Sequence, residues 1–164
     1  MLGRPWSAAA STVVDRAKSG RALGTAGRIG VMDIADAVAF ITENDRAVLA
    51  TRKRDDRLQM SPVSAGVIDG KIVISSRSHL AKVANLRRNA AVSVLVFTTG
   101  FFGPWVQVDG TAEIVEQPEA LDLLDEVYRA IVGEHPDWAD YRRAMIADRR
   151  VVIRITPQSA SGQL

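Results

Sequence analysis

The sequence has no cysteine and only two histidines, His79 and His135, among its 164 residues. The lack of cysteine excludes disulfide bonds, thiolate nucleophiles and cysteine-ligated zinc or iron–sulfur sites. Two histidines exclude a multi-histidine metal site and disfavour a Ser–His–Asp triad. Glycine-rich phosphate loops and the G-x-S-x-G nucleophile elbow are also missing from the sequence. We therefore assign no catalytic side chain and expect any chemistry to come from a bound cofactor.

Long apolar runs are missing as well. Every apolar run stops well short of a membrane span, and the first 30 residues lack the continuous apolar core of a secretory signal. Hydrophobic residues nevertheless make up 47% of the chain, which is too much for a disordered protein and enough for one domain with a sizeable core. Because nothing marks export, we expect a cytoplasmic protein that binds no membrane.

Positive charge is concentrated at the start of the chain. The isoelectric point is about 9.3, but residues 1–31 hold five basic residues and one acid, which leaves 16 basic and 18 acidic residues elsewhere. The remainder is slightly acidic, so we expect no nucleic-acid partner. We interpret 1–31 as a flexible basic N-terminal extension and 32–164 as the folded domain. The alternative is a basic arm that folds over a partner subunit or an anionic ligand.

The hydrophobic patterns predict a strand-rich fold. Asp33 can cap a helix that runs to about Asn44, and Asp69-Gly70 is a strong hairpin signal. Pro62 lies in a strand-like segment and must therefore occupy a sheet edge, a strand end or a bulge. We expect strands at 46–53, 58–68, 72–76, 91–97, 104–116 and 151–156, and further helices at 78–89, from Pro118 onward and at 134–150. Because hairpins dominate, these elements predict a mainly β fold, an antiparallel barrel with helices packed outside.

Hydroxyls and cations gather where the strand at 72–76 passes into the next helix. Ser75, Ser76 and Arg77 precede the helix, and Lys82 lies one turn into it. On a helix over 78–89, Ser78, Lys82, Asn85 and Asn89 share one face, opposite Leu80, Val83 and Ala84. A helix start with free N–H groups and nearby cations favours a bound anion such as phosphate. The same spacing also fits an ordinary solvated helix face with a serine cap.

Five segments in this order resemble a known family. They read VLATRKRDDRLQMSPV, GKIVISS, LAKVANLRRNAAVSVLV, VDGTAEIVEQPEAL and EHPDWADYRRAMIADRRVVIRI. The segments resemble the pyridoxamine 5′-phosphate oxidase-like split β-barrel proteins, and specifically their flavin/deazaflavin oxidoreductase branch. The resemblance covers roughly residues 33–156, and five ordered motifs are much more specific than any one of them.

The resemblance implies a homodimer of split barrels with the cofactor, coenzyme F-420 or FMN, at the subunit interface. Ser75 and Lys82 match phosphate-binding positions of the family, with Ser76 and Arg77 alongside. Other residues match family positions that contact the rest of the cofactor. Those along its ring are Gln59, Ser61, Pro62 and Val63, and those near its ring and tail are Thr51, Arg52 and Arg54. Trp105 is expected to reach the cofactor from the partner subunit. Asn85 joins this set because it shares the predicted helix face of Lys82.

Two departures from the family pattern bear on function. Leu80 stands where an arginine is common, which leaves Arg77 to supply the charge or weakens phosphate binding. The segment RITPQSASGQL is not followed by the Arg- and Trp-containing segment of true pyridoxamine phosphate oxidases, which argues against vitamin B6 oxidation.

We therefore expect an F-420-dependent reductase that transfers hydride to an electron-poor conjugated small molecule. The cations Arg52, Lys53, Arg54 and Arg57 would attract the anionic oligoglutamate tail of F-420. Two alternatives stay open: an FMN-dependent oxidase or reductase of the same fold, and a non-catalytic flavin- or deazaflavin-binding protein.

Overall fold

The computed structural model describes residues 30–100 and 102–164. Its strands are β1 (Gly30–Met32), β2 (Arg46–Arg52), β3 (Leu58–Ser64), β4 (Gly66–Ile68), β5 (Lys71–Arg77), β6 (Ala91–Phe97), β7 (Trp105–Val115) and β8 (Arg150–Gln163). Its helices are α1 (Ile34–Glu43), α2 (Ala81–Arg88), α3 (Ala120–Ile131) and α4 (Trp138–Ala147). The predicted N-terminal extension lies outside the described residues up to position 29, and Gly30 and Val31 take part in β1.

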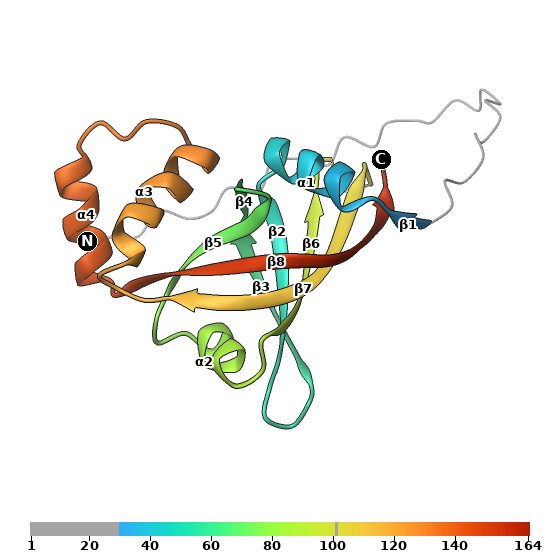
Figure 1. Cartoon of the computed structure of the whole chain (residues 1–164), viewed down its shortest axis with the longest axis horizontal. Coiled ribbons are helices and arrows are strands. Elements are labelled where there is room, and N and C mark those ends of the chain that lie inside the picture. Colours follow the sequence, from blue (N-terminus) through green and yellow to red (C-terminus); the bar gives the residue numbers. More distant parts are fainter. Residues whose placement is uncertain (1–29, 101) are drawn as a thin grey trace, which may run out of the picture.

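The strands form one curved antiparallel sheet, a half-barrel in the order β3-β2-β6-β7-β8-β5-β4, with β1 paired to β8. Helices α1 and α2 lie at opposite ends of the sheet, and α3 and α4 lie together beside the end where β5 and β8 meet (Figure 1). This arrangement confirms the predicted antiparallel split β-barrel with helices outside. Within the described residues, no helix has the length and apolar character needed to cross a bilayer.

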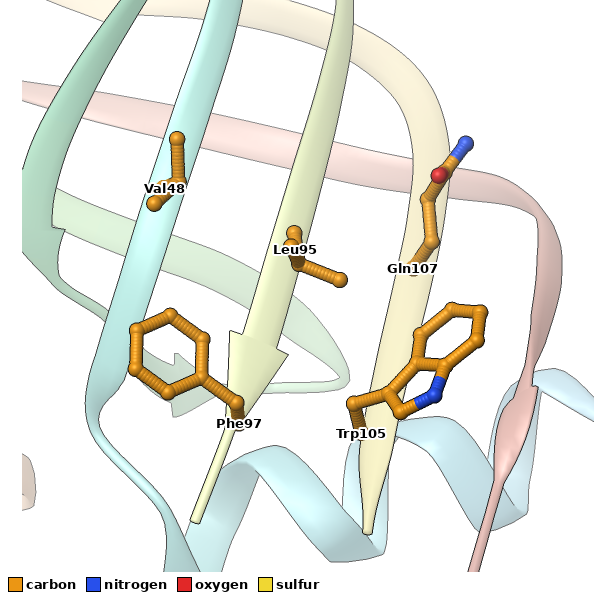
Figure 2. Close-up of a pocket in the computed structure, with 5 residues that line it drawn as sticks. All are labelled: Val48, Leu95, Phe97, Trp105 and Gln107. Atoms are coloured by element: carbon orange, nitrogen blue, oxygen red, sulfur yellow. The ribbon is translucent and has the colours of Figure 1, made fainter. Parts of the chain in front are cut away.

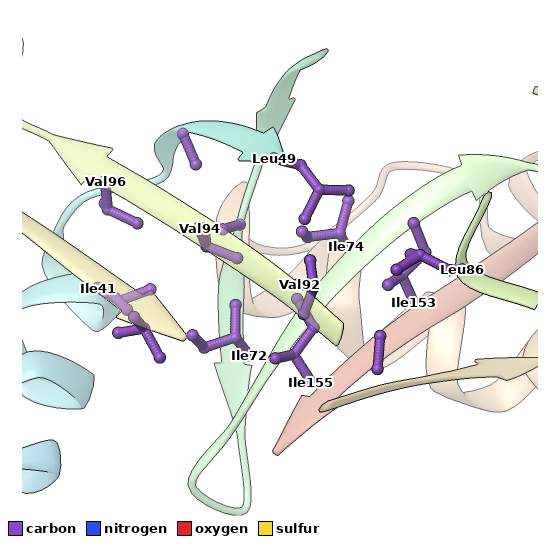
Figure 3. Packing of buried hydrophobic residues seen from close by; sticks show 14 of the residues in the cluster. Ile41, Leu49, Ile72, Ile74, Leu86, Val92, Val94, Val96, Ile153 and Ile155 are labelled. Carbon is purple, nitrogen blue, oxygen red and sulfur yellow. The ribbon is translucent and has the colours of Figure 1, made fainter. Parts of the chain in front are cut away.

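Two apolar clusters hold the fold together. The larger one fills the concave side of the sheet, where Leu49, Ile74, Val94 and Ile153 are fully buried (Figure 3). The smaller one packs α3 and α4 against the outer face of β5 and β8, through residues such as Leu124 and Val152. Consecutive residues of β5 and β8 are therefore buried, since one face of each strand is covered by the sheet interior and the other by helices.

Several local predictions are confirmed. The Asp33 carboxylate caps α1 by accepting a hydrogen bond from the Ala35 N–H at 3.0 Å. Asp69 and Gly70 form the β4–β5 turn with φ values of 50° and 71°, as a tight hairpin requires. Pro62 lies on β3, which ends the strand order, so it occupies a sheet edge as predicted.

Element boundaries differ from the predictions where distant segments pair. The predicted helix at 78–89 begins only at Ala81, because the Ser78 N–H donates to the Arg149 carbonyl and residues 77–80 form a turn, in which the Leu80 N–H donates to the Arg77 carbonyl. The predicted strand at 58–68 divides at Ala65 into β3 and β4. The last strand continues from 156 to Gln163, since a register shift at Asp109/Gly110 lets β7 keep pairing with it past Pro157. The last two helices are shorter than predicted, at 120–131 and 138–147.

Candidate functional site

Asn85 joins α2 to the β2–β3 hairpin. Its Nδ2 donates to Thr51 Oγ1 at 3.1 Å and to Gln59 Oε1 at 2.9 Å. Thr51 and Gln59 are register partners across the hairpin. Asn85 was expected on the open face of the helix, but it is buried and Ala84 is exposed, because α2 packs through Val83, Asn85 and Leu86. Three predicted site residues are thus brought together by one amide.

A cation-rich cleft lies beside this junction. The cleft has a volume of ≈ 610 Å³ and is lined by Lys53, Arg54, Gln59, Ala81, Ala84, Asn85 and Arg88. Three of these residues are cationic and none is acidic. Arg88, which was not among the predicted site residues, donates to the backbone carbonyl of Arg52 and so joins the loop end of the β2–β3 hairpin to α2. The Arg52 guanidinium itself is exposed and donates to the Asp56 carbonyl at 3.3 Å.

The predicted phosphate residues lie at the end of β5 and the start of α2. Lys82 is half-buried and has no ion-pair partner among the described residues, and burial, followed by repulsion from Arg150, lowers its pKa below the usual 10.5. Ser76 is buried, and its Oγ lacks a hydrogen-bond partner within the part of the chain that the structure describes. A buried hydroxyl without a partner and a desolvated lysine without a carboxylate both fit an anionic group at this place.

Arg77 is already engaged. Its Nε and Nη2 donate to Asp148 Oδ2 at 3.1 and 3.0 Å. This contact lowers the pKa of the Asp148 carboxyl below its usual range. The charge that Arg77 was expected to supply in place of an arginine at position 80 is therefore shared with Asp148.

Arg150 is a further cation near the end of β5, and it was not among the site residues predicted from the sequence. It is the register partner of Arg77 across β5 and β8, and its Nη1 lies 3.5 Å from Ser75 Oγ. The only signal in the sequence is the run Asp148-Arg149-Arg150, which places a cation beside Ser75 only once the last strand is known to pair with β5.

The predicted ring strand offers a backbone edge. Gln59, Ser61 and Val63 alternate with the exposed Met60 and Pro62 along β3. In the described sheet β3 pairs with β2 on one side and ends the strand order on the other. The backbone groups on that outer side are therefore available to hydrogen-bond the polar edge of a planar ligand.

Trp105 lies apart from the other predicted site residues. It is the register partner of Phe97 at the end of the β6–β7 hairpin, whereas Thr51 and Asn85 lie near the opposite end of the sheet. There it lines a recess of ≈ 520 Å³ with Val48, Leu95, Phe97 and Gln107, on the outer face of β2, β6 and β7 (Figure 2). Within one chain the structure does not bring Trp105 to the cleft.

Residues 35–163 match the family model described as pyridoxamine 5′-phosphate oxidase. A conserved hypothetical protein from Mycobacterium tuberculosis is 29% identical, with a TM-score of 0.68, over 85% of this chain and 89% of its own. An F-420 reductase is 20% identical with a TM-score of 0.58, over 74% of this chain and 94% of its own. A FAD-binding protein from Mesorhizobium loti is 21% identical with a TM-score of 0.60, over 82% of this chain and 96% of its own. The last two likenesses show the shared fold.

Proposed function

The chain belongs to the pyridoxamine 5′-phosphate oxidase family of flavin-type oxidoreductases, and we propose that it is a reductase that uses coenzyme F-420. In this proposal reduced F-420 donates hydride to an electron-poor conjugated small molecule. The cation-rich cleft between α2 and the β2–β3 hairpin carries the proposal, because Lys53, Arg54 and Arg88 line it without a compensating acid. FMN ends in one phosphate, whereas F-420 continues into an anionic oligoglutamate tail that such a cleft suits.

The residues present fit a phosphate-bearing cofactor. Lys82 and the Ser75 hydroxyl would hold the phosphate, since Lys82 is half-buried without a carboxylate partner among the described residues. The outer backbone edge of β3 would lie along the ring, with Pro62 on the exposed side. Lys53 and Arg54 would hold the tail. When bound, the cofactor supplies the hydride.

The protein's own contribution to the reaction is binding and orientation. The Asn85 amide fixes Thr51 and Gln59 and thereby the strand that would face the ring. The Arg88 contact to the Arg52 carbonyl holds the hairpin against α2 and would thereby help to exclude water from a bound ring. We assign no side chain as acid or base.

We further propose that two copies form the working unit in the cytoplasm. The recess lined by Val48, Leu95, Phe97 and Trp105 is an apolar surface on the outer face of the sheet (Figure 2). A second copy that packs on it would bury these side chains and would carry Trp105 of each subunit toward the cofactor of the other.

The proposal is tested by titrating the purified protein with F-420 and with FMN at low and high salt, following ligand fluorescence. We expect F-420 to bind more tightly than FMN and to lose affinity with salt, because several exposed cations attract its tail. Preference for FMN would favour an FMN-dependent oxidase or reductase. Tight F-420 binding without hydride transfer to quinones or enones would favour a carrier protein.

A lysine substitution tests the phosphate site within the same assay. We expect Lys82→Ala to weaken FMN and F-420 binding about tenfold or more and to leave phosphate-free riboflavin unchanged, because a charge-assisted contact is lost. Lys71→Ala is the matched control, since Lys71 lies at the other end of β5 and pairs with Glu113 at 3.7 Å. Equal binding of FMN by the parent and Lys82→Ala would remove Lys82 from the site.

A further inference from the structure

A third pocket, besides the cation-rich cleft and the recess at Trp105, lies beneath α3 and α4, on the side of β5 opposite the sheet interior. It has a volume of ≈ 250 Å³. Val127 and Ile131 of α3 and Met145 of α4 contribute apolar walls, and Ser64, Ser75 and Arg150 contribute polar groups from the strands. The pocket is therefore apolar on its helical side and polar on its sheet side. The wider cleft beside Arg88 shares none of these residues.

Tyr128 and Tyr141 also line the pocket, but the polar end of Tyr141 is used elsewhere. The Tyr141 hydroxyl donates to the Leu124 carbonyl at 3.1 Å, and burial raises the pKa of this phenol above its usual value. The hydrogen-bonding capacity of the pocket thus rests on the two serines, on Arg150 and on the Tyr128 hydroxyl.

The guanidinium of Arg150 is poorly satisfied by its neighbours. Its Nη1 lies 3.5 Å from Ser75 Oγ and its Nε lies 3.4 Å from Asp148 Oδ2, both at the outer limit of hydrogen bonding. Asp148 makes its shorter contacts to Arg77. An arginine has five donors, so most of those on Arg150 have no hydrogen-bond partner among residues 30–100 and 102–164. No acidic residue lines the pocket, and only 27% of the Arg150 side chain is exposed.

We propose that this pocket binds a small apolar molecule that carries one carboxylate. Arg150 and Ser75 bind the carboxylate, and Ile131 and Met145 contact the apolar body. A planar guanidinium matches a carboxylate through paired hydrogen bonds, and the apolar walls favour an aromatic or branched aliphatic group. The volume suits a ligand of about a dozen heavy atoms, which is smaller than a flavin or deazaflavin. Ser75 is also assigned to the proposed phosphate site, so the pocket adjoins that site, whereas Arg150 and the helical walls belong to the pocket alone.

The test uses trans-cinnamate and its neutral isostere cinnamamide as probes of the cofactor-free protein, in calorimetric titrations. We expect cinnamate to bind about tenfold more tightly than the amide. Arg150→Gln should abolish this difference, and Arg150→Lys should keep part of it. Arg154→Gln is the matched control, because Arg154 lies on the same strand and pairs with Glu113 away from the pocket.

A second variant tests the pocket without changing Arg150, whose substitution could also disturb the fold. Val132 lines the pocket mouth with 64% of its surface exposed, so Val132→Trp fills the pocket from outside the core. We expect it to lose cinnamate while binding FMN as the parent does. Unchanged cinnamate affinity in Arg150→Gln or in Val132→Trp would overturn the proposal. An equal loss of cinnamate and FMN in Arg150→Gln, with riboflavin unaffected, would also overturn it and would place Arg150 in the phosphate site. Failure of F-420 to bind bears only on the proposed function.

Discussion

At the scale of single residues, Lys82 combines partial burial with a cationic neighbour. Burial and then Arg150 lower its pKa from 10.5. Between the lowered pKa of the folded protein and 10.5, the unfolded chain binds more protons than the folded one. The contribution of Lys82 to stability is therefore unfavourable below that window and improves as pH rises through it. A bound phosphate acts in the opposite direction, because it favours the charged lysine.

This titration predicts how cofactor affinity changes with pH. We expect FMN or F-420 affinity to fall on the alkaline side, starting below the ordinary lysine pKa of 10.5, because the anion loses its cationic partner when Lys82 deprotonates. Lys82→Arg should shift this fall out of the accessible range, since a guanidinium stays charged. Titrations of both proteins between neutral pH and pH 10 measure the effect. An identical alkaline fall in Lys82→Arg would assign it to another group.

At the scale of elements, the contact between α2 and the β2–β3 hairpin depends on one buried amide. Asn85→Ala removes the amide that donates to Thr51 Oγ1 and Gln59 Oε1. Thr51 is buried and Gln59 is half-buried, so both oxygens lose this donor away from bulk water. We expect a loss of about 1–3 kcal/mol in the free energy of unfolding, measured by urea denaturation. His79→Ala, at an exposed position just before α2, is the control and should change stability little. A loss equal to that of the control would mean that the amide does not hold the helix in place.

Local sequence patterns predicted correctly those structural features that depend only on residues close together in the chain. The Asp33 cap, the Asp69-Gly70 turn and the edge position of Pro62 each follow from the chemistry of the residues concerned. The start of α2 does not, because the Ser78 N–H donates to the carbonyl of Arg149, far along the chain, and a turn separates β5 from the helix.

The residues of the candidate site likewise include some that were predicted from the sequence and others, such as Arg150, that were not. Thr51, Gln59 and Asn85 meet beside the cleft, as a site built on two adjacent elements should. Arg150 was missed because its neighbours Ser75 and Arg77 come from a strand that precedes it by three helices and two strands. Only the pairing of β8 with β5 brings these side chains together, and no local pattern encodes that pairing.

At the scale of the whole molecule, the apolar recess on β2, β6 and β7 predicts self-association. Leu95→Asp places a charge at its centre, beside Val48 and Trp105 (Figure 2). We expect the parent to have twice the monomer mass by light scattering and the variant to be monomeric, because burying an unpaired carboxylate costs more than the contact returns. Val31→Asp, at a residue that is 99% exposed on β1, should leave the mass unchanged. A monomeric parent would contradict the prediction.

Strand β8 is the last strand in chain order, yet it lies between β7 and β5 and also pairs with β1. During synthesis on the ribosome the β2–β3 and β4–β5 hairpins emerge early, but no strand connects β5 to β7 until Arg150–Gln163 has left the exit tunnel. The sheet therefore closes only after nearly all of this chain has been translated, and it closes through contacts of long sequence separation, which form slowly. A nascent chain that stalls before Arg150 exposes two open sheet edges, at β5 and β7, for the time that translation takes to resume.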